Sequence, residues 1–437
     1  MAQDMNAMHV PLSRNDQQEA LTGRQQLIDI LKQSGCLSTP AVEAAFRAVP
    51  RHLFLPGIPF DKVYVDEAIP TKYQDGFAIS SSSQPAVMAT ILEQLEVQAG
   101  HHIVEIGAGT GYNAALLATL AGEEGQVVTI DIDDDIVTDA QEHLKMAGFH
   151  HVRVVCGDGA FGYRDAAPYD RIILTVGSWD IAPAWIDQLK PGGRLLLPLA
   201  LRANMQQLVA FERVDTHLVS ISVRAGGFMQ LRGAGAGPQT QIPLGPTPGL
   251  ALGLEEPRAI DARQIYAHLI GPHTDRAISL RVTPQDIWGG INHWLALHAP
   301  TTCHLTAMGA LAQQNVVPDL FGVTSTYQAT LGLLGGTTLC VLVRSASRSA
   351  NRESPGDIGA CMEVDAPART LRVRRFGPDE QLAERLIEHL SAWERAGRPS
   401  TMGLRIRAYP QEVPYTPSVS EIIIAKRWTR LVLDWPS

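Results

Sequence analysis

The sequence predicts an α/β fold for the first half of the chain, in which helices cover both faces of a parallel β-sheet. Between about residues 85 and 230, short runs of Val, Ile and Leu alternate with segments of helical pattern. This alternation of strands and helices is typical of a parallel sheet. The apolar runs lack a polar residue at every second position, as expected for strands that are buried on both faces.

Five strands and three helices are expected in this region. The strands are predicted from HIVEIG, QVVTIDID, VRVVCGD, DRIILTVG and GRLLLPL, and the helices from NAALLATLAG, IVTDAQEHLKMAG and APAWIDQLK. Ahead of them, about residues 16–60 are expected to form helices. Leu27, Ile28 and Leu31 recur there at helical spacing, and Thr39-Pro40 suits the start of a second helix.

The chain of 437 residues is long enough for two hydrophobic cores. Residues 1–235 are predicted to form the first domain, residues 236–258 a Gly/Pro-rich linker, and residues 259–437 an α+β domain. The second domain is expected to hold the helices DARQIYAHLIG and DEQLAERLIEHLSAWERAG and the strands TTLCVLVRS, LRIRAYP and SEIIIAKRWTRLVLDW. It contains no catalytic motif, and is compatible with peptide binding, homodimer formation or a lid.

The composition excludes several classes of protein. Hydrophobic residues make up 45% and charged residues 19% of the chain, as in soluble globular proteins. The net charge of -9 without a basic run argues against nucleic acid as a partner. Neither a secretory signal nor a membrane span is predicted, so a cytoplasmic protein is expected. The cysteines and histidines show no metal-ligand spacing, and no metal is expected.

A glycine-rich loop, GAGTGYNAALLA, follows the first predicted strand directly. Small residues there let the backbone approach a ligand, and the next helix offers free N–H groups. A dinucleotide site needs a third small residue three positions after the second glycine, where this chain has Tyr112. The pattern is instead E-x-G-x-G-x-G. Its candidate cofactor-binding residues are Glu105, Gly107, Ala108, Gly109 and Gly111.

Two acids follow at the ends of the next strands. Asp131 ends the second strand, where a carboxylate can accept hydrogen bonds from both ribose hydroxyls, and Ile132 after it is a further candidate for cofactor binding. Asp158, followed by Gly159, ends the third, where it can accept from an adenine amino group. With the turn KPGGR before the fifth strand, this order predicts S-adenosylmethionine as cofactor on a class I, Rossmann-like methyltransferase sheet. The alternative is a doubly wound fold in which the glycines only turn corners.

About residues 45–215 resemble the protein-L-isoaspartate O-methyltransferases. The matching segments are VPRHLFLP, YVDEAIP, ISSSSQP, VEIGAGTGYNAALLA, GDGAFG, APYDRIILTVG and LKPGGRLLLPL. In that family, a serine ahead of the Pro-led helix lies beside the substrate carboxylate. The resemblance therefore implies a catalytic role for Ser83, and a cofactor contact for Gln206 or its neighbour Gln207.

The chain departs from that family in two respects. It has four serines in a row, Ser80 to Ser83, and about 200 additional C-terminal residues. Both features, with the GYNAALLA variant, resemble the branch linked to ribosomally synthesised peptides, the lanthipeptide- and ATP-grasp-associated methyltransferases. This second resemblance implies a precursor peptide as substrate, and Ser81 and Ser82 are further candidates for substrate binding.

A structural interpretation of the serines stands beside this one. A serine just before a Pro-led helix often accepts hydrogen bonds from the free N–H groups of the first turn. Tyr64 and Asp66 lie in the family's substrate-side segment, but an aromatic residue and an acid near a turn are more often structural. The sequence alone does not decide between capping and substrate contact for Ser80, Ser81 and Ser82.

The predicted function is S-adenosylmethionine-dependent methylation of an aspartyl or isoaspartyl carboxylate in a peptide or protein. A carboxylate with a pKa near ~4 is already ionised at neutral pH, so no general base is needed. The favoured role is modification of a precursor peptide through a methyl ester and a succinimide. The alternatives are general isoaspartyl repair, methylation of a small molecule, and a cofactor-binding module without turnover.

Overall fold

The computed structural model describes residues 13–74, 77–202, 205–254, 256, 258–321, 327–344 and 368–435. The first twelve residues, in which no secretory signal is predicted, lie outside this part of the chain. The chain divides into two compact units, Met1–Gly157 and Asp158–Ser437, which are described in turn. Among the described residues, no helix is both long and apolar enough to cross a membrane.

The first unit begins with helices, as predicted. These elements are α1 (Arg14–Gln33), α2 (Pro40–Ala48), η1 (Arg51–Phe54) and α3 (Phe60–Val63). Leu27, Ile28 and Leu31 are buried on one face of α1. The hydroxyl of Thr39 accepts a hydrogen bond from the Val42 N–H at 3.4 Å, so the predicted helix start is confirmed. A hairpin of β1 (Ile69–Gln74) and β2 (Phe77–Ser82) and the buried helix α4 (Pro85–Leu95) follow.

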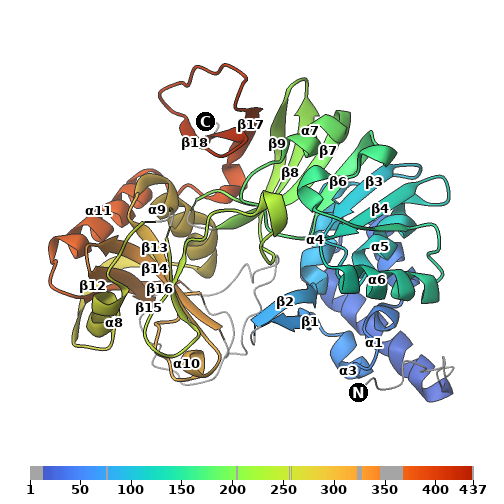
Figure 1. The fold of residues 1–437 in the computed structure, drawn as a ribbon. Helices are drawn as coiled ribbons and strands as arrows, with labels where there is room; N and C mark the ends of the chain where they lie inside the picture. Colours follow the sequence, from blue (N-terminus) through green and yellow to red (C-terminus); the bar gives the residue numbers. More distant parts are fainter. Residues whose placement is uncertain are drawn as a thin grey trace. The chain divides into compact units, whose positions relative to one another are not determined.

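Three parallel strands complete the first unit, in the order β3-β4-β5. They are β3 (His102–Ile106), β4 (Gln126–Asp131) and β5 (Arg153–Cys156), with α5 (Tyr112–Ala121) and α6 (Asp134–Met146) between them. Figure 1 shows these helices beside the strands. Each begins where a strand has just ended, so the loops after β3 and β4 lie at the carboxyl edge of the sheet, where ligands bind in open α/β folds.

The second unit opens with the last predicted strands of the parallel region. Here η2 (Gly159–Phe161), η3 (Arg164–Ala166), β6 (Tyr169–Leu174) and α7 (Pro183–Gln188) precede β7 (Leu189–Ala200), β8 (Gln206–Val214) and β9 (His217–Ala225). Strand β6 pairs with β7 in parallel, whereas β7, β8 and β9 are antiparallel. The strands and helices expected between HIVEIG and GRLLLPL are therefore confirmed.

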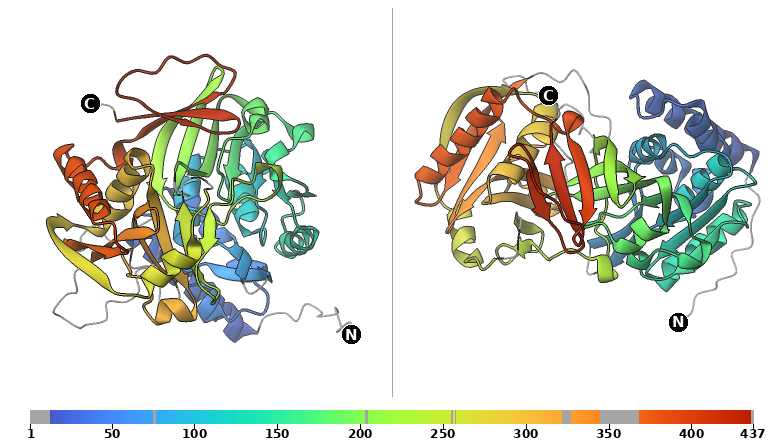
Figure 2. Two further views of the ribbon diagram at one scale, coloured as in Figure 1. Left: turned by 60° about the vertical axis from the view of Figure 1, so that its left-hand side comes forward. Right: turned by 90° about the horizontal axis from the view of Figure 1, so that it is seen from above.

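A second sheet in this unit has seven strands in the order β10-β11-β13-β14-β15-β16-β12. They are β10 (Gln241–Pro243), β11 (Leu250–Leu254), β12 (His273–Val282), β13 (Thr302–Met308), β14 (Tyr327–Gly335), β15 (Thr338–Arg344) and β16 (Arg369–Phe376). The associated helices are η4 (Gly233–Gly235), α8 (Ala262–Leu269), η5 (Asp286–Ile291), α9 (Asn292–His298), α10 (Ala310–Gln313) and α11 (Gln381–Arg395). Helix α11, the orange-red helix at the left of both views in Figure 2, packs on β14, β15 and β16. Its residues Leu382, Leu386, Leu390 and Trp393 are buried in the core.

The structure corrects the predicted domain limits in two places. The predicted linker 236–258 contains β10 and β11, which belong to the seven-stranded sheet. The end of the predicted C-terminal domain leaves that sheet: after η6 (Thr401–Gly403), β17 (Arg405–Pro410) pairs with β9, and β19 (Thr429–Asp434) lies between β17 and β18 (Ile422–Ala425). Figure 1 shows β17 beside β9. An apolar strand pattern identifies a strand but not its partner.

Candidate functional site

The glycine loop joins β3 to α5 through three glycines with positive φ, Gly107, Gly109 and Gly111. A Cβ on Gly111 would lie 3.1 Å from Leu144 Cγ and 3.3 Å from the Ala140 carbonyl, so α6 needs a glycine there. A Cβ on Gly109 would lie 3.7 Å from the Ser81 carbonyl oxygen. The loop backbone therefore passes close to the serine strand β2.

Backbone hydrogen bonds fix the start of this loop. The N–H groups of Gly107 and Ala108 both donate to the Ile130 carbonyl, at 2.8 and 3.1 Å. Ala108 is buried. These two N–H groups hold the loop to β4, and we propose that Gly107 and Ala108 contribute to cofactor binding by shaping the loop backbone.

Asp131 lies at the carboxyl end of β4, next to the glycine loop. Its Oδ2 accepts from the Gly109 N–H at 3.2 Å, and its Oδ1 accepts from the Asp133 N–H at 3.3 Å. The residue is half-buried, and Ile132 beside it is exposed. A carboxylate has about four acceptor positions, so Asp131 keeps acceptor capacity for ligand hydroxyls.

Glu105 is fully buried at the end of β3. Its carboxylate accepts from Asn113 Nδ2 at 2.8 Å and from Thr129 Oγ1 at 2.7 Å. Burial raises the pKa of Glu105 to about 7, although both hydrogen bonds act in the opposite direction. We therefore assign Glu105 a structural role that joins β3, β4 and α5, in place of the predicted direct contact with the cofactor.

The serine run divides into side chains with different surroundings. Ser80 Oγ accepts from Thr71 Oγ1 at 3.3 Å across the β1–β2 hairpin. Ser82 is 3% exposed, and its hydroxyl accepts from the Arg51 guanidinium at 3.4 Å. We therefore propose a structural role for Ser82, for which the sequence predicts a substrate contact. Ser81 and Ser83 are half-buried and remain the candidates for substrate binding and catalysis.

Helix α4 is capped by a residue that the capping interpretation of the serines did not consider. Asp66 Oδ1 accepts from the Ala86 N–H at 2.7 Å, and Asp66 Oδ2 accepts from Gln84 Nε2 at 3.0 Å. The N-cap residue Gln84 makes no side-chain capping bond itself. Because Asp66 supplies the cap, the capping alternative does not account for Ser83.

Arg51 is a buried residue beside the serines, and the sequence analysis did not single it out. Its guanidinium is fully buried and donates to the carbonyls of Val63 at 3.0 Å and Ser83 at 3.0 Å. Burial lowers its pKa. It lies 5.9 Å from the ring centre of Tyr112, which follows the glycine loop. An arginine within the apolar segment VPRHLFLP was the available signal, because buried charges need partners.

Lys72 attaches the β1–β2 hairpin to the loop that follows Asp131. Its ammonium group lies 2.9 Å from Asp133 Oδ2 and 2.7 Å from Asp135 Oδ1. The hydrogen bond that Lys72 donates to Asp135, and next the one that it donates to Asp133, raises the pKa of Lys72. The hairpin that carries the serines is thus connected both to the glycine loop and to the end of β4.

In the second unit, Asp158 begins the turn η2 and makes two hydrogen bonds. Its Oδ1 accepts from the Ala160 N–H at 3.0 Å, and its Oδ2 accepts from the Ala234 N–H at 2.6 Å. The residue is half-buried, so it keeps a face for a ligand. Gly159 is buried, and its carbonyl accepts from Trp185 Nε1 at 2.9 Å.

Gln206 at the start of β8 is occupied by backbone contacts. Its Nε2 donates to the Phe228 carbonyl at 2.9 Å, and its Oε1 accepts from the Phe228 N–H at 2.7 Å. Gln207 is buried. We therefore assign Gln206 to the support of the segment around Phe228, in place of the predicted cofactor contact.

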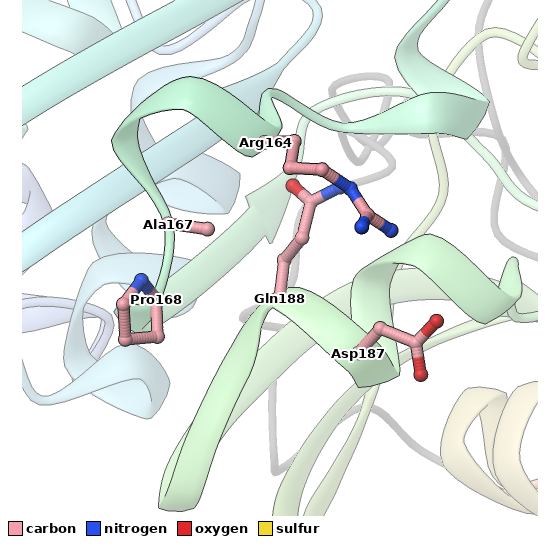
Figure 3. A pocket seen from close by; sticks show the side chains of 5 residues that line it. All are labelled: Arg164, Ala167, Pro168, Asp187 and Gln188. Atoms are coloured by element: carbon pink, nitrogen blue, oxygen red, sulfur yellow. The ribbon is translucent and has the colours of Figure 1, made fainter.

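A cavity of about 420 Å³ lies beside α7 in the second unit (Figure 3). It is lined by Arg164, Ala167, Pro168, Asp187 and Gln188. Gln188 Oε1 already accepts from the Tyr163 N–H at 2.9 Å, and its Nε2 donates to the Phe161 carbonyl at 2.8 Å. The lining includes none of the predicted site residues, so this cavity does not define the candidate site.

Comparisons with known proteins agree with the resemblance seen in the sequence. Residues 22–231 match the model of the family Protein-L-isoaspartate(D-aspartate) O-methyltransferase. The chain is similar to the protein-L-isoaspartate O-methyltransferase of Methanococcus aeolicus, with 36% identity over 46% of this chain and 91% of that protein. It is also similar to the Thermotoga maritima enzyme of the same name, with 37% identity over 45% of this chain and 62% of that protein.

A solved structure titled protein-L-isoaspartate O-methyltransferase is similar to this chain with a TM-score of 0.48 and 23% identity. That similarity covers 93% of this chain and 98% of the other. Residues 232–437 lie beyond the segment that matches the family model. The segment that matches the family model includes the glycine loop, the serine strand and the parallel strands described above. The chain belongs to the protein-L-isoaspartate (D-aspartate) O-methyltransferase family and is an S-adenosylmethionine-dependent methyltransferase.

Proposed function

We propose that this protein methylates a carboxylate of isoaspartyl residues in peptides or proteins. The observation that carries the proposal is the position of the serine strand against the glycine loop. The Ser81 carbonyl is 3.7 Å from the point where Gly109 would carry a Cβ. A carboxylate bound beside Ser83 is therefore close to the backbone that, in this proposal, holds the cofactor.

The residues of the first unit suit S-adenosylmethionine. Gly109 leaves the loop backbone without a side chain, and Asp131 at the next strand end keeps free acceptor positions. We propose that Asp131 accepts hydrogen bonds from the ribose hydroxyls, and that Asp158 accepts from the adenine amino group. When bound, the cofactor supplies an electrophilic methyl group on a sulfonium.

The side chains have little proton chemistry to perform. The substrate carboxylate is ionised at neutral pH, so it is already a nucleophile. We propose that the Ser83 hydroxyl donates a hydrogen bond to one carboxylate oxygen and so directs the other toward the methyl group. Water solvates a carboxylate strongly, and an oriented, dry site can account for roughly 7–11 kcal/mol of the barrier. The methyl ester is a better electrophile than a carboxylate, so the following backbone nitrogen can attack its carbonyl carbon and close a succinimide as methanol leaves with the amide proton.

The substrate is the part of the proposal that the relatives inform most. Those reported above bear the name of isoaspartyl methyltransferases, which supports general repair. The precursor-peptide hypothesis rests on the serine run and on the residues beyond the matched segment. The hydroxyls of Ser80 and Ser82 are hydrogen-bonded to Thr71 and Arg51 within the protein. The serine run therefore gives less support to a special peptide-binding surface. We therefore place repair ahead of peptide maturation.

The test is base-labile methyl transfer to two peptides that differ only in aspartate versus isoaspartate. We expect methylation of the isoaspartyl peptide. Ser83→Ala should lower kcat/KM about 10- to 100-fold, because a hydrogen bond to a charged group contributes about 1.5–3 kcal/mol. Ser80→Ala is the matched control, since its hydroxyl is bonded to Thr71, and should change kcat/KM little.

The same assay also has outcomes that would contradict the proposal. No transfer to either peptide, with cofactor binding intact, would favour a dedicated precursor peptide or a module without turnover. Full activity of Ser83→Ala on the isoaspartyl peptide would remove the serine from the mechanism but keep the peptide as substrate.

A further inference from the structure

The last hairpin of the chain ends in a tight turn that packs on the loop after β6. The turn consists of Lys426, Arg427, Trp428 and Thr429, and the Lys426 N–H donates to the Thr429 carbonyl at 2.8 Å. Asp180, which is 1% exposed, accepts from the Trp428 N–H at 2.6 Å and from Thr429 Oγ1 at 2.5 Å. The turn is therefore fixed to a buried carboxylate.

Aromatic and backbone contacts add to this attachment. Lys426 is buried, donates to the Ala200 carbonyl at 3.0 Å and lies 4.6 Å from the ring centre of Trp179. The Arg427 guanidinium lies 5.9 Å from the same ring and 5.1 Å from that of Trp428. These contacts restrict the Arg427 side chain although the residue itself is exposed.

Arg427 contacts the loop that holds Asp158. Its Nη1 donates to the Ala234 carbonyl at 2.8 Å, and its Nη2 donates to the Ala236 carbonyl at 3.2 Å. The N–H of the same Ala234 donates to Asp158 Oδ2 at 2.6 Å. The loop is close-packed against this carboxylate, because a Cβ on Gly233 would lie 2.3 Å from Asp158 Oδ2.

We propose that Arg427 is a positioning residue for Asp158. By holding two carbonyls of the loop 233–236, it keeps the Ala234 N–H on Asp158 Oδ2 and fixes the orientation of the carboxylate toward the adenine amino group. This inference rests on the proposed cofactor contact of Asp158. It gives the final hairpin, which lies outside the family match, a role in cofactor binding.

The test compares Arg427→Ala with Arg430→Ala by calorimetric titration with S-adenosylhomocysteine. Arg430 lies in the same hairpin but donates to Val413 and Gln411. We expect Arg427→Ala to raise the dissociation constant about three- to tenfold, as for the loss of one or two hydrogen bonds that act through a neighbour. KM for S-adenosylmethionine should rise with it, while KM for the peptide and the urea midpoint stay unchanged.

Two further variants connect the effect to Asp158. Asp158→Ala should weaken binding by itself, and adding Arg427→Ala to it should weaken binding no further, because the two residues act in one path. Arg427→Lys should restore only part of the affinity, since one ammonium group replaces a two-armed guanidinium.

The outcomes separate this inference from the proposed function. If Asp158→Ala weakens binding and Arg427→Ala does not, Asp158 keeps its proposed role and the inference is overturned. If Asp158→Ala leaves binding unchanged, the proposed adenine contact fails and the inference fails with it. Equal weakening by Arg430→Ala, or additive effects in the double variant, would also overturn it.

Discussion

Two acids that follow neighbouring strands, Asp131 and Asp158, are held in place by very different means. Asp131 accepts from Gly109, 22 positions away, and from Asp133. Asp158 accepts from Ala160, but also from Ala234, whose loop is held by Arg427 a further 193 positions along the chain. The first acid is supported by its own motif. The second depends on the end of the chain, which a motif search does not examine.

This difference explains what the sequence predicts well. The strands from HIVEIG to GRLLLPL are continuous apolar runs that sheets bury on both faces, so their positions follow from local pattern. The glycine loop and Asp131 are within one strand–helix–strand unit, and their proximity follows from the topology of that unit. Contacts within one strand–helix–strand unit can therefore be predicted from the sequence.

The part that the sequence does not predict comes from long-range contacts. SEIIIAKRWTRLVLDW is predicted as one strand, but it forms β18 and β19 with a turn at Arg427 and Trp428, where no Gly, Asn or Pro marks the bend. The cap of α4 comes from Asp66, 20 positions before Ala86. The burial of Ser82 and Glu105 likewise follows from partners that their own motifs do not specify.

The largest expected effect concerns Arg51, which makes a long-range contact in the first unit. Its guanidinium donates a hydrogen bond to the carbonyl of Ser83, 32 positions along the chain. Arg51→Met should lower the free energy of unfolding by about 3–5 kcal/mol, because it leaves several buried carbonyls without a donor. Urea denaturation measures this as a lower midpoint with an unchanged slope. Arg47→Met, at an exposed arginine of α2, is the control and should cost less than about 1 kcal/mol. Equal midpoints for the two variants would contradict the role given to Arg51.

The next effect tests whether Glu105 is structural. Because burial raises its pKa from 4.5 to about 7, the folded state keeps its proton between these values while the unfolded state releases it. Stability is therefore present below pH 4.5 and is lost as the pH rises to about 7, by roughly 3 kcal/mol in total. Glu105→Gln removes this loss and keeps the contacts, since the Thr129 hydroxyl can accept as well as donate.

Unfolding measured at pH 5 and pH 8 checks this expectation. From pH 5 to pH 8 the wild type should lose stability and Glu105→Gln should not, so the variant should be more stable relative to the wild type at pH 8 than at pH 5. Glu142→Gln, at an exposed position on α6, should show the same pH dependence as the wild type. Parallel curves for Glu105→Gln and the wild type would mean that the carboxylate is ionised in the folded state at both pH values.

The smallest expected effect concerns Asp131, the acid that is held by residues near it in the chain. Asp131→Ala should raise the dissociation constant of S-adenosylhomocysteine about tenfold or more, on the order of 1.4 kcal/mol, through loss of the ribose contacts. Asp134→Ala, in the exposed first turn of α6, is the matched control and should leave binding unchanged. Because Asp131 is held by neighbours in its own motif, its effect should be independent of Arg427, and the two substitutions should add. An effect of Asp131→Ala that disappears in the Arg427→Ala background would show that both acids depend on the final hairpin.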